Sequence, residues 1–251
     1  MAAMMVKPRS GSDGKRMCGR FVISKFPEDV ARWFGTTGPV PNSRPRYNVA
    51  PTDQIAVVRF NPETKERTLD TLRWGLVPYW AKDAKIGATM INAKAETVAE
   101  KPAFREAFKS HRCLIPADGF YEWKKLDAKT KQPYAIVMKD RSLFGFAGLW
   151  ERWKDKASGE VVRSFTIITT TPNEVCEPIH DRIPVIVDPA HYGKWLGEEA
   201  VDPVRLLMML KPFPAEQMES YRVGTAVGNV KNDEAALLTP IVASLVGCES
   251  G

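Results

Sequence analysis

The 251-residue chain has few of the residues that build metal sites and disulfide frameworks. It contains three histidines and only four cysteines, Cys18, Cys113, Cys176 and Cys248. The cysteines form no C-x-x-C pair, and the histidines complete no zinc motif with them. We therefore expect reduced thiols, no metal and no cofactor.

Long hydrophobic runs, signal sequences and repeats are also missing. No apolar run approaches the roughly 18 residues that cross a bilayer. Residues 1–16 lack the apolar centre of a signal peptide, and neither an internal repeat nor a low-complexity block follows. These absences predict a monomeric cytoplasmic protein with no membrane partner, associated with the nucleoid if the host is a bacterium.

The net charge of the chain is modest once residues 1–16 are counted separately. The composition is 44% hydrophobic and 26% charged, which is ordinary for a globular domain. Half of the net charge of +6 comes from residues 1–16, so about +3 belongs to residues 17–251. A polyanionic partner is allowed but not required by this charge.

The pattern of the first half predicts a short strand, a helix and a hairpin. Phe21–Ile23 reads as a strand, and Pro27 begins a helix with Val30, Trp33 and Phe34 on one face and Gly35 as its stop. Residues 36–53 are rich in proline and asparagine and read as an ordered, irregular loop. Residues 54–60 and 67–76 read as a hairpin.

The second half predicts further strands between short helices. A helix from Pro102 ends near His111, and helices are expected at about 189–196 and 203–211. Strands are expected at 114–115, 120–124, 134–139, 143–153 and 164–170, and a short strand region near the C-terminus. The absence of regular βαβ alternation predicts an α+β fold with a curved, mostly antiparallel sheet or barrel-like core and flanking helices. We expect one domain over 17–240, a disordered or non-native extension over 1–16 and a tail over 241–251.

Three polar stretches carry reactive or recognition groups at positions where packing alone would not require them. Asn92 lies in Asn92-Ala93-Lys94-Ala95-Glu96, which also reads as a strand end with a local backbone contact. Glu122 lies between aromatics, where an interior position would raise its pKa and an exterior one would pair it with Lys124. His180 lies in a proline-flanked loop beside Asp181; its imidazole can transfer protons at neutral pH, although such a histidine is often structural.

Cations and aromatics are interleaved in residues 72–82. If they are exposed, they suit phosphate contacts and base stacking on single-stranded DNA. The alternation of Leu72 with Trp74 places at least one tryptophan inside, so residues 78–82 are the better candidates for a binding rim.

Cys18 follows Met17 and could become an N-terminal residue. Such a residue carries a free amine and a thiol, which together close a thiazolidine ring on an aldehyde carbon. With sixteen residues ahead of Met17, the same nitrogen would be an amide and this chemistry would be blocked. A small buried cysteine is the alternative interpretation.

The order of these motifs resembles the SRAP (SOS response-associated peptidase) family of abasic-site processing proteins, over about residues 17–240. The motifs that carry the resemblance are Met17-Cys18-Gly19-Arg20-Phe21, Tyr47-Asn48-Val49-Ala50-Pro51, Arg73-Trp74-Gly75-Leu76-Val77-Pro78, Asn92-Ala93-Lys94-Ala95-Glu96-Thr97, Asp118-Gly119-Phe120-Tyr121-Glu122-Trp123-Lys124, Ile179-His180-Asp181-Arg182-Ile183-Pro184 and Ala226-Val227-Gly228-Asn229-Val230-Lys231.

The resemblance implies an abasic-site sensor that binds single-stranded DNA and forms a thiazolidine crosslink through Cys18. It implies that Asn92 positions the amine and the sugar, that Glu122 transfers protons, and that His180 helps to open the sugar ring. The DNA contacts that it implies are Arg20, Arg73, Trp74, Lys94 and Arg182. Lys94 departs from the arginine expected there and lacks the bidentate guanidinium.

Three accounts fit the residues ahead of Cys18. Translation starts at Met17, or the chain cleaves itself before Cys18 with the thiol as nucleophile, or the extension stays and the protein does not crosslink. Two rival functions are a thiol peptidase that uses Cys18 and His180, and a non-covalent module that binds single-stranded DNA.

Overall fold

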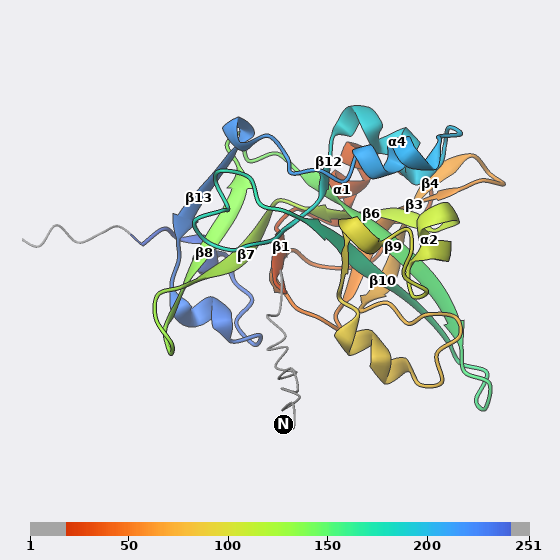
Figure 1. Cartoon of the computed structure of the whole chain (residues 1–251), viewed down its shortest axis with the longest axis horizontal. Coiled ribbons are helices and arrows are strands. Elements are labelled where there is room, and N and C mark those ends of the chain that lie inside the picture. Colours follow the sequence, from red (N-terminus) through yellow and green to blue (C-terminus); the bar gives the residue numbers. More distant parts are fainter. Residues whose placement is uncertain (1–18, 242–251) are drawn as a thin grey trace, which may run out of the picture.

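A computed structural model of the chain describes residues 19–241. Cys18, the expected extension 1–16 and residues 242–251 of the expected tail lie outside the described residues. The described residues form one domain with a mostly β core and short helices, which confirms the predicted α+β fold with a barrel-like core (Figure 1).

Five strands close into a barrel, because each pairs with two neighbours around a ring. In ring order they are β10 (Val161–Thr170), β4 (Glu66–Trp74), β3 (Gln54–Asn61), β6 (Arg112–Ala117) and β9 (Phe144–Lys154). All these pairs are antiparallel except β10 with β4. The interior is filled by apolar side chains that include Trp74, Phe146 and Phe165, so the barrel is a packed core.

A second sheet lies against the barrel and is antiparallel throughout. Its strands, in order, are β13 (Met218–Arg222), β8 (Lys131–Met138), β7 (Gly119–Lys125), β1 (Phe21–Ile23) and β2 (Arg46–Val49). Phe120 and Ile136 face the main core, whereas Tyr121 and Ala135 face a smaller cluster with Val227. The middle of this sheet is therefore buried on both faces.

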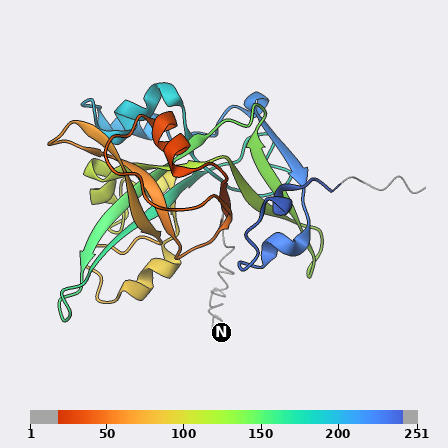
Figure 2. The same cartoon turned by 180° about the vertical axis from the view of Figure 1, so that it is seen from behind.

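Short helices and strands cover the ends of the barrel. The helices are α1 (Pro27–Phe34), α2 (Arg105–Ser110), α3 (Tyr192–Leu196) and α4 (Pro203–Met208), and the remaining strands are β5 (Asn92–Lys94), β11 (Ile183–Pro184) and β12 (Ile186–Val187). The 3₁₀ turns are η1 (Ala84–Thr89), η2 (Ala95–Thr97), η3 (Pro189–His191), η4 (Ala215–Gln217), η5 (Thr225–Gly228) and η6 (Ala235–Leu238). Both views place α1 and α4 on one side of the molecule, and η1 and the tip of the β7–β8 hairpin on the opposite side (Figures 1 and 2).

The ends of helix α1 were predicted correctly from local sequence signals. It begins at Pro27 and ends at Gly35, whose left-handed φ of 63° returns its N–H to the carbonyls of Ala31 and Arg32, as the sequence predicted. The prediction that Trp33 lies on the buried face is wrong, because the buried face extends from Val30 toward Ala31 and leaves Trp33 48% exposed.

Two other boundaries differ from the prediction. The expected loop 36–53 contains the strand β2, which exists because it pairs with β1, a contact that local composition does not reveal. The helix expected from Pro102 begins at Arg105. Within residues 19–241, no helix is long and apolar enough to cross a membrane, and no group of three or more His, Cys, Asp and Glu side chains is arranged to hold a metal ion.

Candidate active site and nucleic-acid interface

Glu122 is a buried carboxylate on β7. Its exposure is 3%, and it follows Phe120 on the strand face that looks toward the main core. The Tyr121 N–H donates to the Arg20 carbonyl at 3.0 Å, and continuing the pairing of Phe21 with Phe120 sets Gly19 opposite Glu122. The first described residue of the chain therefore borders this carboxylate.

The loop between β10 and β11 brings His180 to the same region. Burial raises the pKa of the Cys176 thiol in this loop to about 12, and the negative charge of nearby Glu122 adds to the rise. The His180 N–H in turn donates to the Cys176 carbonyl at 3.0 Å. The loop that carries His180 is thus close enough to Glu122 for the charge of this carboxylate to act on Cys176.

Nδ1 of the His180 imidazole lies close to the backbone of Arg182 and to the Asp181 carboxylate. The side chain is 8% exposed, and Nδ1 lies 3.2 Å from the Arg182 N–H and 3.1 Å from Oδ1 of Asp181. The Arg182 N–H can donate to Nδ1 only when this nitrogen carries no proton, whereas a protonated Nδ1 can donate to the Arg182 carbonyl at 3.3 Å or to Asp181. A protonated ring gains the Asp181 carboxylate as a partner instead.

Arg182 ties this loop to the strands. Its guanidinium makes a bidentate pair with Glu96 at 2.6 and 2.9 Å and donates to the Thr169 carbonyl. The hydrogen bond from Arg182 lowers the pKa of Glu96. With a side chain that is only 13% exposed, Arg182 is an anchor between the loop, β10 and η2.

Three of the expected site residues line one edge of β10. Arg73 pairs with Ser164, Asn92 with Ile167 and Lys94 with Thr169. At about 3.3 Å per residue, Arg73 lies roughly 10 Å from Asn92 and Asn92 roughly 7 Å from Lys94. Lys94 is exposed, and Asn92 and Arg73 are half-buried. Because side chains alternate along a strand, Asn92 and Lys94 project from one face of the sheet and Arg73 from the other.

The aromatic residues near Arg73 divide into core and surface. Trp74 has no exposed surface, its indole N–H donates to the Ile91 carbonyl at 2.9 Å, and its ring packs against Phe21 and Phe165. The implied DNA contact by Trp74 is wrong for this conformation, because no face of the ring can reach a base. Tyr79 and Trp80 are 60% and 47% exposed and form the aromatic rim.

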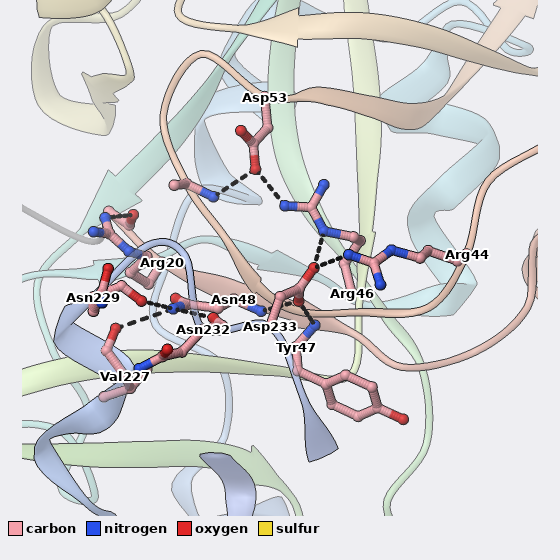
Figure 3. A network of polar contacts seen from close by, with 12 residues as sticks. Arg20, Arg44, Arg46, Tyr47, Asn48, Asp53, Val227, Asn229, Asn232 and Asp233 are labelled. Carbon is pink, nitrogen blue, oxygen red and sulfur yellow. Dashed lines mark hydrogen bonds and ion pairs between the residues drawn. The ribbon is translucent and has the colours of Figure 1, made fainter. Parts of the chain in front are cut away.

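A polar network that the sequence did not reveal anchors residues 227–233 to β2 (Figure 3). The two N–H groups of the buried Asn48 side-chain amide are shared among the carbonyls of Val227, Asn229 and Asn232, which lie 3.1, 3.1 and 2.9 Å from Nδ2. The Asp233 carboxylate accepts from the N–H groups of Tyr47 and Asn48 and from Arg46 and Arg44; we call Asn48, Asp233 and these partners the Asn48–Asp233 latch.

Arg20 is drawn in the same view as this latch (Figure 3). Its Nη1 donates to the Gly19 carbonyl at 2.9 Å, which turns the guanidinium back along the start of the described chain. The motifs that contain Asn48 and Asn229 are both visible in the sequence. Neither motif had an assigned role, so the contact between them was not predicted.

Comparison with known proteins settles the family. The family model described as "SOS response associated peptidase (SRAP)" matches residues 17–230. The chain belongs to the SRAP family. This SRAP chain is 46% identical to "Abasic site processing protein YoqW" of Bacillus subtilis over 224 residues, which are 88% of this chain and 99% of the relative.

More distant SRAP relatives and solved structures agree with this assignment. The chain is 28% identical to "Abasic site processing protein HMCES" of Xenopus tropicalis, covering 90% of this chain and 79% of the relative. A crystal structure of a protein from Bacteroides thetaiotaomicron matches with a TM-score of 0.81 at 27% identity, covering 90% of this chain and all of that one.

The SRAP fold places Arg73, Asn92 and Lys94 on strands that pair with β10. The charge of Glu122 acts on Cys176 in the loop that carries His180, and Arg182 connects this loop to β10, with which the strand of Asn92 and Lys94 pairs. Cys18 lies outside the described residues. Glu96, Asn48 and Asp233 are the structural members of this region to which the sequence alone gave no role.

Proposed function

We propose that this chain processes abasic sites in single-stranded DNA and captures them covalently through Cys18 as an N-terminal residue. The observation that carries the proposal is the buried Glu122 carboxylate beside Gly19, the residue bonded to Cys18. A carboxylate in that position suits a proton transfer to or from the α-amine. Membership of the SRAP family and the printed names of the relatives support the same substrate.

The proposed reaction forms two bonds, one from nitrogen and one from sulfur, to C1′ of the sugar. The neutral α-amine, whose ordinary pKa is near 8, attacks C1′ of the ring-opened deoxyribose aldehyde. The carbinolamine loses water and becomes an imine. The Cys18 sulfur then adds to the imine carbon, its proton passes to the nitrogen, and a thiazolidine remains. One water molecule leaves, and no oxidant or metal takes part.

Each neighbouring side chain has a role that its chemistry permits. Glu122 gives a proton to the departing hydroxyl and takes it back when the crosslink reverses. His180, whose Nδ1 lies 3.2 Å from the Arg182 backbone nitrogen, helps to open the sugar ring by proton transfer. The Asn92 amide orients the amine and the sugar.

The flanking strand binds along the edge of β10. Arg20, Arg73 and Lys94 provide charge for phosphates, and the exposed rings of Tyr79 and Trp80 provide stacking surfaces worth about 1–3 kcal/mol per base. Arg182 is already paired with Glu96, so we assign it to positioning the His180 loop. A single copy of the chain contains all these groups, and we propose a monomer as the active form.

The test uses protein that begins at Cys18 and an oligonucleotide with one abasic site. An adduct that survives a denaturing gel is expected with the wild-type chain and with Cys113→Ala, which removes a buried thiol from the barrel. Cys18→Ala should form none. If Cys18→Ala crosslinks as well as the wild type, or if the wild type does not crosslink at all, the proposal fails.

A second activity is favoured by the word peptidase in the family description and by a family match that begins at Met17. We propose that a chain with residues ahead of Cys18 can remove them. The Cys18 sulfur attacks the Met17 carbonyl carbon, the C–N bond breaks to free the amine, and water hydrolyses the thioester. The intact mass should then decrease to that of a chain starting at Cys18, and Cys18→Ala should keep its full mass.

A further inference from the structure

We infer that the tip of the β7–β8 hairpin, residues 124–131, is a second DNA-binding surface that holds the backbone of the strand several nucleotides from the lesion. This inference rests on the proposed DNA-binding function and extends its footprint. We call this segment the lysine hairpin. It contains Lys124, Lys125, Lys129 and Lys131 against the single acid Asp127, a net charge of +3.

The charges of the lysine hairpin are not neutralised by the fold. Among residues 19–241, no ion pair within 4.0 Å involves any of its four lysines. The exposed Asp127 carboxylate accepts hydrogen bonds from the N–H groups of Lys129 and Thr130 at 2.7 and 2.8 Å and from the Thr130 hydroxyl. The one acidic group is thus occupied in closing the turn.

The strand register sets like charges against each other. Lys125 pairs directly with Lys131 across the hairpin, an arrangement that costs stability because directly opposed like charges repel. Arg222 on the neighbouring strand β13 adds a further cation, since its Nη2 donates to the side chain of Gln132, the residue after Lys131. A polyanion bound at the tip would relieve this repulsion.

Turn formation does not require these lysines. The β9–β10 hairpin uses Asp155 in the same way, with the N–H groups of Ala157 and Ser158 donating to its carboxylate. Its tip, residues 154–160, carries two lysines against two acids and has no net charge. The excess of lysine is therefore a property of one hairpin and not of the turn type.

The lysine hairpin is close enough to the site to share one strand of DNA. It continues β7 directly beyond Glu122, and Lys125 lies three residues, or about 10 Å, further along the strand. At about 3.4 Å per stacked nucleotide, the tip reaches phosphates roughly three to five nucleotides from the lesion. The tip and η1, which follows the aromatic rim in sequence, lie on the same side of the molecule (Figure 1).

Lysines at a sheet edge can also serve to prevent aggregation, and the test separates the two roles. The variant is Lys125→Gln/Lys129→Gln/Lys131→Gln in the full domain beginning at Cys18. The matched control is Lys25→Gln/Lys139→Gln/Lys211→Gln, which removes three exposed charges elsewhere; Lys139 lies about 26 Å from Lys131 along β8.

Affinity for an oligonucleotide that contains a stable abasic analogue is measured as a function of salt. Losing three phosphate contacts should reduce the steepness of the plot of log K against log salt by about 2 and weaken binding roughly tenfold to a hundredfold at 0.1 M salt. The control variant should match the wild type. The crosslinking rate at saturating DNA should stay within twofold, since Glu122 and His180 are untouched.

Shortening the oligonucleotide locates the contact. Trimming one arm to two nucleotides should remove the difference between the lysine-hairpin variant and the wild type, whereas trimming the other arm should preserve it. A lysine-hairpin variant with the same salt dependence as the control, or a difference that survives trimming of both arms, would overturn the inference while leaving the proposed function intact. A wild type that binds no DNA would overturn the proposed function itself.

Discussion

Replacing Asn48 by alanine should destabilise the domain more than any polar-to-alanine change at its surface. The side chain has no exposed surface, and its amide donates to three backbone carbonyls, of which the Val227 carbonyl is fully buried. The carbonyls of Asn229 and Asn232 are nearer the surface and can be rehydrated after the change. The buried Val227 carbonyl is therefore the acceptor that water cannot supply with a new donor after the change.

The expected loss follows from these contacts. One buried carbonyl without a partner costs about 1–3 kcal/mol and the two partly buried hydrogen bonds about 1 kcal/mol together, so Asn48→Ala should lower the free energy of unfolding by about 2–4 kcal/mol. For a domain of this size the corresponding fall in Tm is roughly 4–16 °C. Asn48→Asp should be worse, because a carboxylate has no donor and faces three carbonyl oxygens.

Urea unfolding followed by tryptophan fluorescence measures this loss, with Asn42→Ala as the control. Asn42 is exposed in the same proline-rich segment, and its removal should change the unfolding free energy by less than about 0.5 kcal/mol. An Asn48→Ala variant as stable as Asn42→Ala, or an Asn48→Asp variant more stable than Asn48→Ala, would refute the reasoning.

Two further predictions concern the candidate active site, and a third concerns the Asn48–Asp233 latch. Glu122→Gln keeps the shape of the side chain but cannot transfer a proton, so single-turnover crosslinking on gels should slow by about 10²–10⁴ with unchanged DNA affinity; a rate within threefold of the wild type would remove Glu122 from the mechanism. Arg182→Lys should slow crosslinking by loosening the His180 loop, yet change the salt slope of DNA binding by less than the roughly 0.7 that one phosphate contact contributes; a full change would show that Arg182 binds phosphate. Burial opposes the charge of Asp233, but the Tyr47 N–H and Arg46 lower its pKa below the ordinary 3.8. The stabilisation by the charged Asp233 is therefore complete above pH 3.8 and is lost as the pH falls through the folded pKa. Thermal melts should show a stability gap between wild type and Asp233→Asn at neutral pH that closes in acid, and a gap independent of pH would contradict this assignment.

Local signals in the sequence predicted the elements that depend on local chemistry. The helix that Pro27 starts and Gly35 ends, and the hairpin of β3 and β4, need only capping, periodicity and turn residues. The strand β2 was missed because its four residues form a strand only by pairing with β1. Trp33 was predicted in the core because its spacing from Val30 fits a helix face. The buried face instead extends from Val30 to Ala31, on the side of the helix away from Trp33.

The candidate site could be predicted as residue types but not as an arrangement. The sequence indicated Asn92, Glu122 and His180, each on a different element. Their relation depends on the parallel pairing of β5 with β10 and on the turn at Cys176, which are contacts between distant parts of the chain. Trp74 shows the opposite case, because the same cation-aromatic pattern is compatible with a DNA contact and with the core, and only burial distinguishes them.

The most direct test of the central claim is the chemistry of residue 18 in the crosslinked protein. The adduct formed by protein that begins at Cys18 is digested with protease and nuclease, and the N-terminal peptide is analysed by mass before and after treatment with a thiol-alkylating reagent. We expect the sugar remnant on residue 18, formed with loss of one water and without any reductant, and a sulfur that the reagent cannot alkylate. A remnant on any other residue, or a Cys18 thiol that remains free to react, would contradict the thiazolidine mechanism.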